Sequence, residues 1–188
     1  MRRRSVLPVL FCLACAGFGA RSLAQPPANQ PWLLIDTSAM TVSIMRGDSS
    51  VKTYDNMAIG SGGTSWDKRR GDGKTPLGEF RILEIRPSAR FDLFMAIDYP
   101  TIHHALQARS QGDLSDAEFA RIESAWHARR WPPQDTVLGG HLGIHGTGAG
   151  SLEIHRDINW TDGCIALTNE QVEDLATRIG PGTFVRIR

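Results

Sequence analysis

The chain has 188 residues, the length of one domain large enough to bury a hydrophobic core. It carries 21 basic and 20 acidic residues, and four arginines but no acidic residue lie among the first 24 positions. The remainder is therefore slightly acidic and has no Lys/Arg-rich run, so nucleic acid is excluded as an expected partner.

The first 24 residues have the features of a secretory signal peptide. Arg2–Arg4 form a positive start, Val6–Ala16 form an apolar run, and Ser22–Ala24 form a small-x-Ala cleavage site. The apolar run is too short for a stable membrane span. We therefore expect export to the periplasm or cell wall and no integral membrane span in the mature chain. A buried N-terminal helix and a lipoprotein signal ending at Cys15 are the alternatives.

The predicted cleavage changes the cysteine inventory. It would remove Cys12 and Cys15 and leave Cys164 as the single thiol. A disulfide within the mature chain would then be impossible. In an oxidising compartment an unpaired thiol is a liability unless it is buried or used in chemistry.

Short β-rich runs separated by turn residues dominate the chain after a Pro-rich linker at 25–31. A capping box at Ser115–Glu118 opens a helix that ends before Pro132–Pro133, and a second helix is predicted over 169–179. These patterns predict one mainly β domain over 32–188, with two or more helices and a helical insertion at about 100–135. Strands are predicted within residues 32–38, 41–48, 51–63, 78–85, 91–100 and 183–188.

The segment Gly71–Pro76, GDGKTP, contains the Gly-Lys-Thr of a phosphate-binding loop. The first glycine of that motif would fall at Lys68, and the segment precedes a predicted strand rather than a helix whose N-terminus could bind phosphate. We interpret the segment as a turn.

Cysteine and histidine come together in the stretch 143–167, GIHGTGAGSLEIHRDINWTDGCIAL. Thiol acyl transfer needs a nucleophilic sulfur, an imidazole that takes and returns a proton, and backbone N–H groups aimed at the developing oxyanion. Gly163 before Cys164 permits a tight turn and close approach of substrate to the backbone. We predict Cys164 as the nucleophile and Gly163 as a backbone oxyanion donor.

Three histidines compete for the role of base. His145 lies where an apolar strand meets a Gly-Thr-Gly turn, and fifteen residues separate it from Thr161, enough for a loop to bring the two together. We predict His145 as the base. His155, in a polar stretch, is interpreted as a surface residue. His141, four positions before His145, should share its strand face, where it either lines the site or caps the sheet end.

Two other interpretations remain open at this point. His141, His145, His155 and Cys164 could supply four zinc ligands, but their spacing matches no paired-ligand pattern, and the predicted mature chain has neither HExxH nor CxxC. A non-catalytic binding module with an inert buried cysteine is the other alternative. The polar Thr-Asp-Gly before Cys164 argues against an apolar burial site.

At these residues the chain resembles the L,D-transpeptidase (YkuD-type) catalytic domain. The family's pattern is a His-Gly pair at a strand end, a gap of some fifteen residues, and then Ser/Thr-His-Gly-Cys. Ile144–Thr147 matches the first part and Thr161–Cys164 the second. Lys74–Phe80 resembles the family's TPxGxF strand entry, and 180–187, GPGTFVRI, resembles its last strand. The resemblance covers roughly residues 31–188.

The resemblance implies a β-sandwich-like catalytic domain that acts on peptidoglycan stem peptides, without a metal or an organic cofactor. Cys164 would attack the carbonyl of the third-position diamino acid and release D-Ala. An amine on a second stem or on a wall-anchored protein, or water in a carboxypeptidase or endopeptidase, would resolve the thioester. The Gly146 carbonyl would orient the imidazole. The candidate substrate contacts are Thr147, Thr161, Asp162 and His141.

The chain departs from the family's pattern at two positions. The histidine before Gly-Cys is Asp162 here, and the Arg or Asn often found two residues after the cysteine is Ala166. The first departure leaves His145 as the only nearby proton acceptor. A carboxylate at Asp162 that points at the sulfur would raise the thiol pKa by repulsion.

Overall fold

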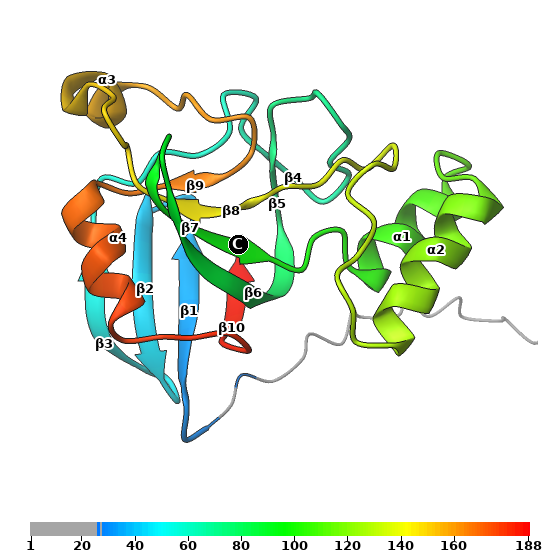
Figure 1. Cartoon of the computed structure of the whole chain (residues 1–188), viewed down its shortest axis with the longest axis horizontal. Coiled ribbons are helices and arrows are strands. Elements are labelled where there is room, and N and C mark those ends of the chain that lie inside the picture. Colours follow the sequence, from blue (N-terminus) through cyan, green and yellow to red (C-terminus); the bar gives the residue numbers. More distant parts are fainter. Residues whose placement is uncertain (1–25, 27) are drawn as a thin grey trace, which may run out of the picture.

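The computed structural model describes residue 26 and residues 28–188 of the chain (Figure 1). The predicted signal peptide, residues 1–24, lies outside the described residues. Within the described part of the chain, no helix is both long enough and apolar enough to cross a membrane.

The fold is built on one eight-stranded mixed sheet in the order β3-β2-β1-β10-β6-β7-β8-β9. The pairs β1–β10 and β8–β9 are parallel, and the other neighbours are antiparallel. A separate two-stranded parallel sheet joins β4 to β5. The strand bounds are β1 Pro31–Asp36, β2 Thr41–Arg46, β3 Ser49–Tyr54, β4 Thr64–Ser65, β5 Thr75–Pro76, β6 Gly78–Ser88, β7 Asp92–Ile97, β8 Gly143–His145, β9 Ile165–Ala166 and β10 Phe184–Ile187.

Strand β6 joins the two halves of the sheet. Its first residues pair with β10 and its later residues with β7, and the pairing register shifts between Ile82 and Glu84. Such an irregularity bends a strand and increases its local twist. In Figure 1 the β1–β2–β10 half and the β7–β8–β9 half accordingly run in different directions. Apolar side chains from both halves, Leu33 and Ile144 among them, belong to one buried core.

Four helices are present among the described residues: α1 Ile102–Ser110, α2 Asp116–His127, α3 Leu152–Asp157 and α4 Asn169–Ala176. The predicted capping box is present at α2, where the Ser115 hydroxyl accepts from the Glu118 N–H. The predicted helix from Asn169 is α4, and it ends at Ala176, earlier than predicted. Val172 and Leu175 of α4 are buried in the core.

Helices α1 and α3 were not predicted. The buried face of α1 consists of Ile102, His104, Ala105 and Ala108, so small and polar residues replace the apolar stripe that makes a helix visible in a sequence. Helix α3 has only six residues. Both lack the sustained apolar periodicity on which sequence prediction depends.

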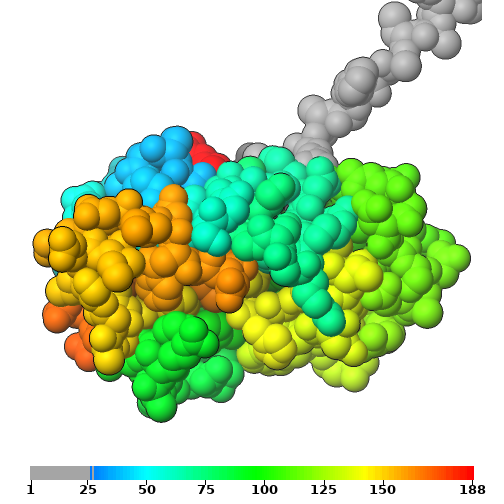
Figure 2. All heavy atoms as spheres, turned by 90° about the horizontal axis from the view of Figure 1, so that it is seen from above, coloured from blue at the N-terminus to red at the C-terminus, as the bar shows by residue number. Residues whose placement is uncertain are grey.

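The predicted strands at 32–38, 41–48, 78–85, 91–100 and 183–188 are confirmed as β1, β2, β6, β7 and β10. The prediction of a strand over 51–63 is only partly right, because β3 ends at Tyr54. The chain beyond it forms isolated bridges instead, from Ala58 to Ala166 and from Gly60 to Thr161. These bridges hold the 58–61 segment against the segment that carries Cys164. Figure 2 shows the two segments as bordering teal and orange surfaces.

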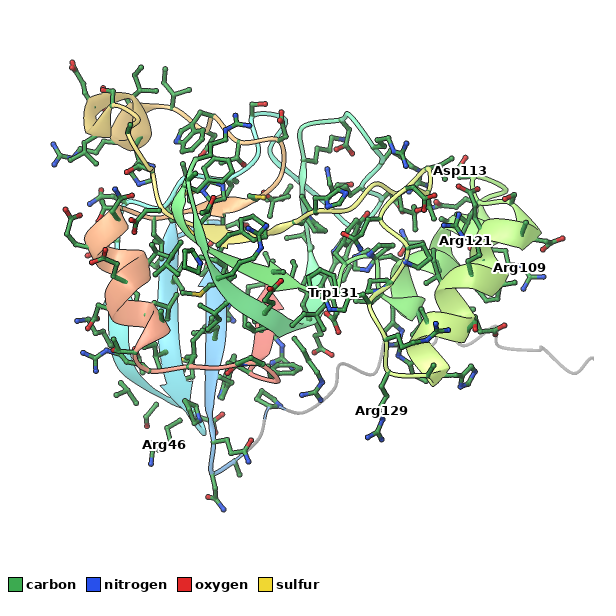
Figure 3. All side chains as sticks on the ribbon, in the orientation of Figure 1. Arg46, Arg109, Asp113, Arg121, Arg129 and Trp131 are labelled. Carbon is green, nitrogen blue, oxygen red and sulfur yellow. The ribbon has the colours of Figure 1, made fainter. Side chains whose placement is uncertain are left out.

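Helices α1 and α2 form an insertion after β7, visible at the right of Figure 1. An ion pair between Arg69 and Asp113, 2.5 Å long, ties the loop after β4 to the turn between the two helices. Figure 3 shows Asp113 at that end of the insertion, with Arg109 and Arg121 nearby on the helices. The insertion therefore supports the loop that contains Lys68 and Arg69.

Candidate active site

His145 is the last residue of β8. This strand lies between β7 and β9, and His145 is the register partner of Phe94 on one side and of Ala166 on the other. Strand alternation places the ring of His145 on the sheet face opposite to the side chain of Ile144, which belongs to the core. The predicted position of His145 at a strand end is confirmed.

Cys164 immediately precedes β9, which pairs in parallel with β8. Paired residues of parallel strands share a sheet face, and so do residues two apart on one strand. His145 pairs with Ala166, and Cys164 lies two residues before Ala166, just outside the strand. Adjacent strands are about 4.8 Å apart. The chain segments that carry His145 and Cys164 are therefore neighbours at this end of the sheet.

Cys164 as a whole residue is half-buried. Its Sγ donates to the carbonyl oxygen of His141 at 3.7 Å. Burial raises the pKa of Cys164 to about 11, against a lowering by the Gly143 N–H and by the charge of Lys68, and the Asp162 carboxylate raises it further. The resting sulfur is therefore a neutral thiol at pH 7.

The imidazole of His145 is 1% exposed. Its Nδ1 lies 2.8 Å from the Gly146 carbonyl oxygen, and because a carbonyl only accepts, Nδ1 carries the hydrogen. Burial lowers the pKa of His145 to about 4, with the Gly146 carbonyl acting in the opposite direction and the Arg90 charge reinforcing the fall. The neutral ring therefore has Nε2 without a proton, which is the state a base requires.

Gly163 needs to be glycine. Its φ of +127° is a conformation that side chains rarely adopt, and a Cβ there would lie 2.4 Å from the Lys74 carbonyl oxygen. Its N–H donates to Thr161 Oγ1 at 3.2 Å, and that hydroxyl donates to the Cys164 carbonyl at 2.7 Å. The Gly163 N–H is thus used inside the turn, so it is not the free oxyanion donor that we predicted.

The four predicted substrate contacts divide into two kinds. Thr147 and Thr161 are buried, and the Thr147 hydroxyl donates to Asn169 Oδ1 at 3.2 Å, so both threonines shape the site from within. Asp162 and His141 are exposed. The prediction that His141 shares the strand face of His145 is wrong, because β8 begins only after it and its φ of +57° interrupts the alternation.

The interpretation of His155 as a surface residue is wrong. His155 lies on α3 and is 2% exposed, and its Nδ1 accepts from the Trp160 indole N–H at 3.3 Å. The polar neighbours suggested a loop, but the short helix α3 directs this one side chain toward the protein interior. Burial lowers the pKa of His155.

The four candidate zinc ligands named from the sequence are not gathered into a cluster. Among residues 26 and 28–188, no group of three or more His, Cys, Asp or Glu side chains lies close enough to hold a metal ion. The four candidate ligands, His141, His145, His155 and Cys164, therefore do not form one metal site.

Four residues of the site's surroundings were missed by sequence reasoning. Phe91 stacks on the His145 ring, and Trp160 meets it edge-on. Asn169 accepts from the Gly148 N–H at 2.8 Å and holds the turn that follows His145. Lys68 is buried near Gly163. The sequence indicated Asn169 only as the start of a predicted helix. It indicated Lys68 only as the residue at the position where a phosphate-binding loop would require glycine.

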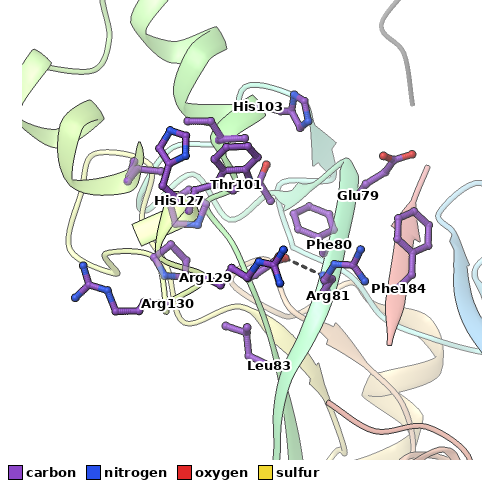
Figure 4. Close-up of a pocket in the computed structure, with 16 residues that line it drawn as sticks. Glu79, Phe80, Arg81, Leu83, Thr101, His103, His127, Arg129, Arg130 and Phe184 are labelled. Carbon is purple, nitrogen blue, oxygen red and sulfur yellow. Dashed lines mark hydrogen bonds between the residues drawn. The ribbon is translucent and has the colours of Figure 1, made fainter. Parts of the chain in front are cut away.

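A groove of about 830 Å³ lies elsewhere, between the helical insertion and β6 (Figure 4). Arg81, Thr101, Arg129 and Phe184 are among the residues that line it, and neither Cys164 nor His145 does. The sulfur and the imidazole therefore do not belong to this groove.

Solved structures share this fold at low sequence identity. The helical cell shape determining protein Pgp2 (K307A mutant) of Campylobacter jejuni is similar with a TM-score of 0.60 and 19% identity, covering 88% of this chain and 49% of that one. Bd1075 of Bdellovibrio bacteriovorus gives 0.53 and 16%, covering 85% and 48%. An L,D-transpeptidase of Stackebrandtia nassauensis gives 0.50 and 9%, covering 91% and 61%. This chain thus spans about half the length of the first two. The curated proteins contain no match.

The fold class is therefore that of L,D-transpeptidase domains, as the sequence resemblance implied. The family model for the YkuD L,D-transpeptidase catalytic domain matches residues 30–187. The chain belongs to this family.

Proposed function

We propose that this protein is an exported cysteine acyltransferase acting on peptidoglycan stem peptides. It cleaves the bond between the third-position diamino acid and D-Ala and passes the acyl group to an amine or to water. The observation that supports this proposal is the parallel pairing of β8, which ends at His145, with β9, which begins directly after Cys164. Family membership supplies the substrate class. The signal-like first 24 residues agree with a substrate outside the inner membrane.

The first half-reaction forms a thioester. As Sγ of Cys164 attacks the carbonyl carbon of the diamino acid, Nε2 of His145 takes the thiol proton. The proton moves during the attack, because the resting pair is a neutral thiol and a neutral imidazole. We propose the Cys164 N–H as the oxyanion donor, since the Gly163 N–H is bound to Thr161. His145 then returns the proton to the departing D-Ala nitrogen as the C–N bond breaks.

In the second half-reaction, the acceptor determines whether the enzyme acts as a transpeptidase or as a hydrolase. An amine from a second stem, or from a wall-anchored protein, attacks the thioester and gives a cross-link. Water instead gives carboxypeptidase or endopeptidase products. In either case His145 takes a proton from the attacking group and returns it to the sulfur. A wall-editing activity of either kind would affect cell shape, the property named for the Campylobacter neighbour.

The test incubates the mature protein with a disaccharide-tetrapeptide, with and without an amine acceptor. D-Ala release followed by mass is the expected result, and the second product distinguishes amine from water as acceptor. Release that is lost on chelation but survives Cys164→Ala would favour a zinc hydrolase instead. Tight binding to isolated sacculi without any D-Ala release would favour a wall-binding module.

A further inference from the structure

Lys68 carries a buried positive charge in the loop between β4 and β5. Its side chain is only 3% exposed, and its Nζ forms a 2.8 Å ion pair with Asp72 Oδ1. Nζ also donates to the carbonyl oxygen of Asp162 at 3.4 Å. A lysine ammonium is rarely buried, because leaving water is costly unless partners compensate it. The burial of the Lys68 ammonium therefore needs an explanation other than hydrophobic packing of its side chain.

The ammonium group lies beside the residue that precedes the nucleophile. A Cβ built on Gly163 would stand 3.1 Å from Lys68 Nζ and 3.2 Å from Lys68 Cε. An ammonium has three N–H donors, and the hydrogen bonds found among the described residues account for two of them. The third N–H of the Lys68 ammonium is therefore available to a group beside Gly163, either a side chain that becomes ionised or a bound substrate.

The loop holds Lys68 firmly in this place. Asp72 accepts from the N–H groups of Arg69 at 2.7 Å and Lys74 at 2.9 Å as well as from Lys68 itself. The hydroxyl of Tyr99 donates to the Lys68 carbonyl at 3.3 Å. With both its backbone and its head group fixed, the charge has little freedom to move away from the turn at Gly163.

Two charges of opposite sign act on the Cys164 sulfur. The exposed Asp162 carboxylate, in the position directly before Gly163, opposes ionisation of the thiol, and the Lys68 ammonium favours it. Solvent and salt screen an exposed charge much more than a buried one. At equal distance, the buried Lys68 ammonium therefore affects the ionisation of the Cys164 thiol more than the exposed Asp162 carboxylate does. The Asp72 carboxylate neutralises part of this effect.

We propose that Lys68 is a positioning residue of the Cys164 site, whose ammonium stabilises the sulfur while it loses its proton to His145 and fixes the 162–164 turn through the Asp162 carbonyl. This inference rests on the proposed function, in which Cys164 is the nucleophile. The competing explanation is that Lys68 and Asp72 merely close their own loop. The two differ in one property, the pH dependence of the thiol's reactivity.

The test measures the rate of Cys164 alkylation by iodoacetamide from pH 7 to 11 in the mature protein, with intact-protein mass as readout. Lys68→Met is expected to move the profile upward by about one pH unit, which is about a tenfold slower reaction at pH 8. Lys68→Arg, which keeps the charge, should recover most of the rate. Lys52→Met is the matched control, since it removes a lysine that pairs with the remote Asp174. A folded Lys68→Met protein with the wild-type profile would overturn the proposal.

A second measurement needs no substitution and therefore no folded variant. The nitrogen NMR shift of Lys68 Nζ is followed from pH 8 to 12 in wild-type protein, with Cys164 either free or blocked by methyl methanethiosulfonate. The proposal requires a titration step at the thiol pKa that only the free protein shows, because coupling between two sites is reciprocal. Identical curves would contradict it. Neither experiment uses a wall substrate, so failure of the D-Ala assay would not be mistaken for failure of this inference.

Discussion

The ring of Phe91 stacks on the ring of His145, with the centroids 4.0 Å apart and the planes inclined by 28°. Trp160 meets the same imidazole edge-on at 5.7 Å. These rings exclude water from the imidazole, and the resulting burial is the main reason why the His145 pKa falls to about 4. Burial among these rings, more than any charged neighbour, therefore keeps the His145 imidazole neutral.

The first prediction concerns the acid limb of activity. His145 must be neutral to accept the thiol proton, and it is neutral above a pKa of about 4. We expect kcat/KM for D-Ala release to stay level as the pH falls through 6.5 and to decline only near pH 4–5. A limb centred at the ordinary histidine value, in protein that circular dichroism shows to be folded, would mean that the base is hydrated or is another residue.

Phe91→Ala should move that limb. Removing the stacked ring admits water to the imidazole, so the His145 pKa and the acid limb rise toward 6.5. Trp126→Ala serves as the control, because this ring on the insertion is 54% exposed and remote from His145. Equal acid limbs in wild type and Phe91→Ala would show that the stacking does not set the pKa.

The depressed pKa also has a consequence for stability. In the unfolded chain His145 binds a proton below about 6.5, whereas the folded protein resists protonation down to about 4. Between these values the unfolded state binds more protons, so the free energy of unfolding should fall by about 3 kcal/mol as the pH drops from 6.5 to 4. Urea unfolding at several pH values measures this. His145→Gln should remove that part of the slope, and an unchanged slope would contradict the assignment.

Gly163→Ala and Gly180→Ala form a matched pair. The first meets the Lys74 carbonyl oxygen and a positive φ, whereas the second has no atom within 4 Å of its added Cβ. We expect Gly163→Ala to cost about 1–3 kcal/mol of stability and to disturb the Cys164 turn. Gly180→Ala should change stability by less than about 0.5 kcal/mol. Thermal melts decide the matter, and equal melting temperatures would show that the turn tolerates a side chain.

Much of this architecture is visible in the sequence because it depends on local patterns. Alternating apolar residues revealed β1, β2, β6 and β7, and the Ser115–Glu118 capping box revealed α2. The resemblance around His145 and Cys164 predicted the family, and β8, which ends at His145, pairs with β9, which begins directly after Cys164. The roles of Cys164 and His145 themselves remain predictions until activity is measured.

What sequence reasoning missed depends on contacts between distant segments. The inward turn of His155, the stack of Phe91 on His145 and the approach of Lys68 to Gly163 each join residues that lie far apart in the chain or on short irregular elements. No periodicity signals such contacts. The use of the Gly163 N–H by Thr161 was likewise invisible, because it depends on the closed geometry of a single turn.

The most direct measurement traps the acyl-enzyme. Mature protein is mixed with the disaccharide-tetrapeptide, quenched in acid within seconds, digested and examined by mass spectrometry. The account predicts an adduct on Cys164 with the mass of the substrate less D-Ala, and neither adduct nor D-Ala release in Cys164→Ala. Release of D-Ala by Cys164→Ala at the wild-type rate, or an adduct on any other residue, would contradict it.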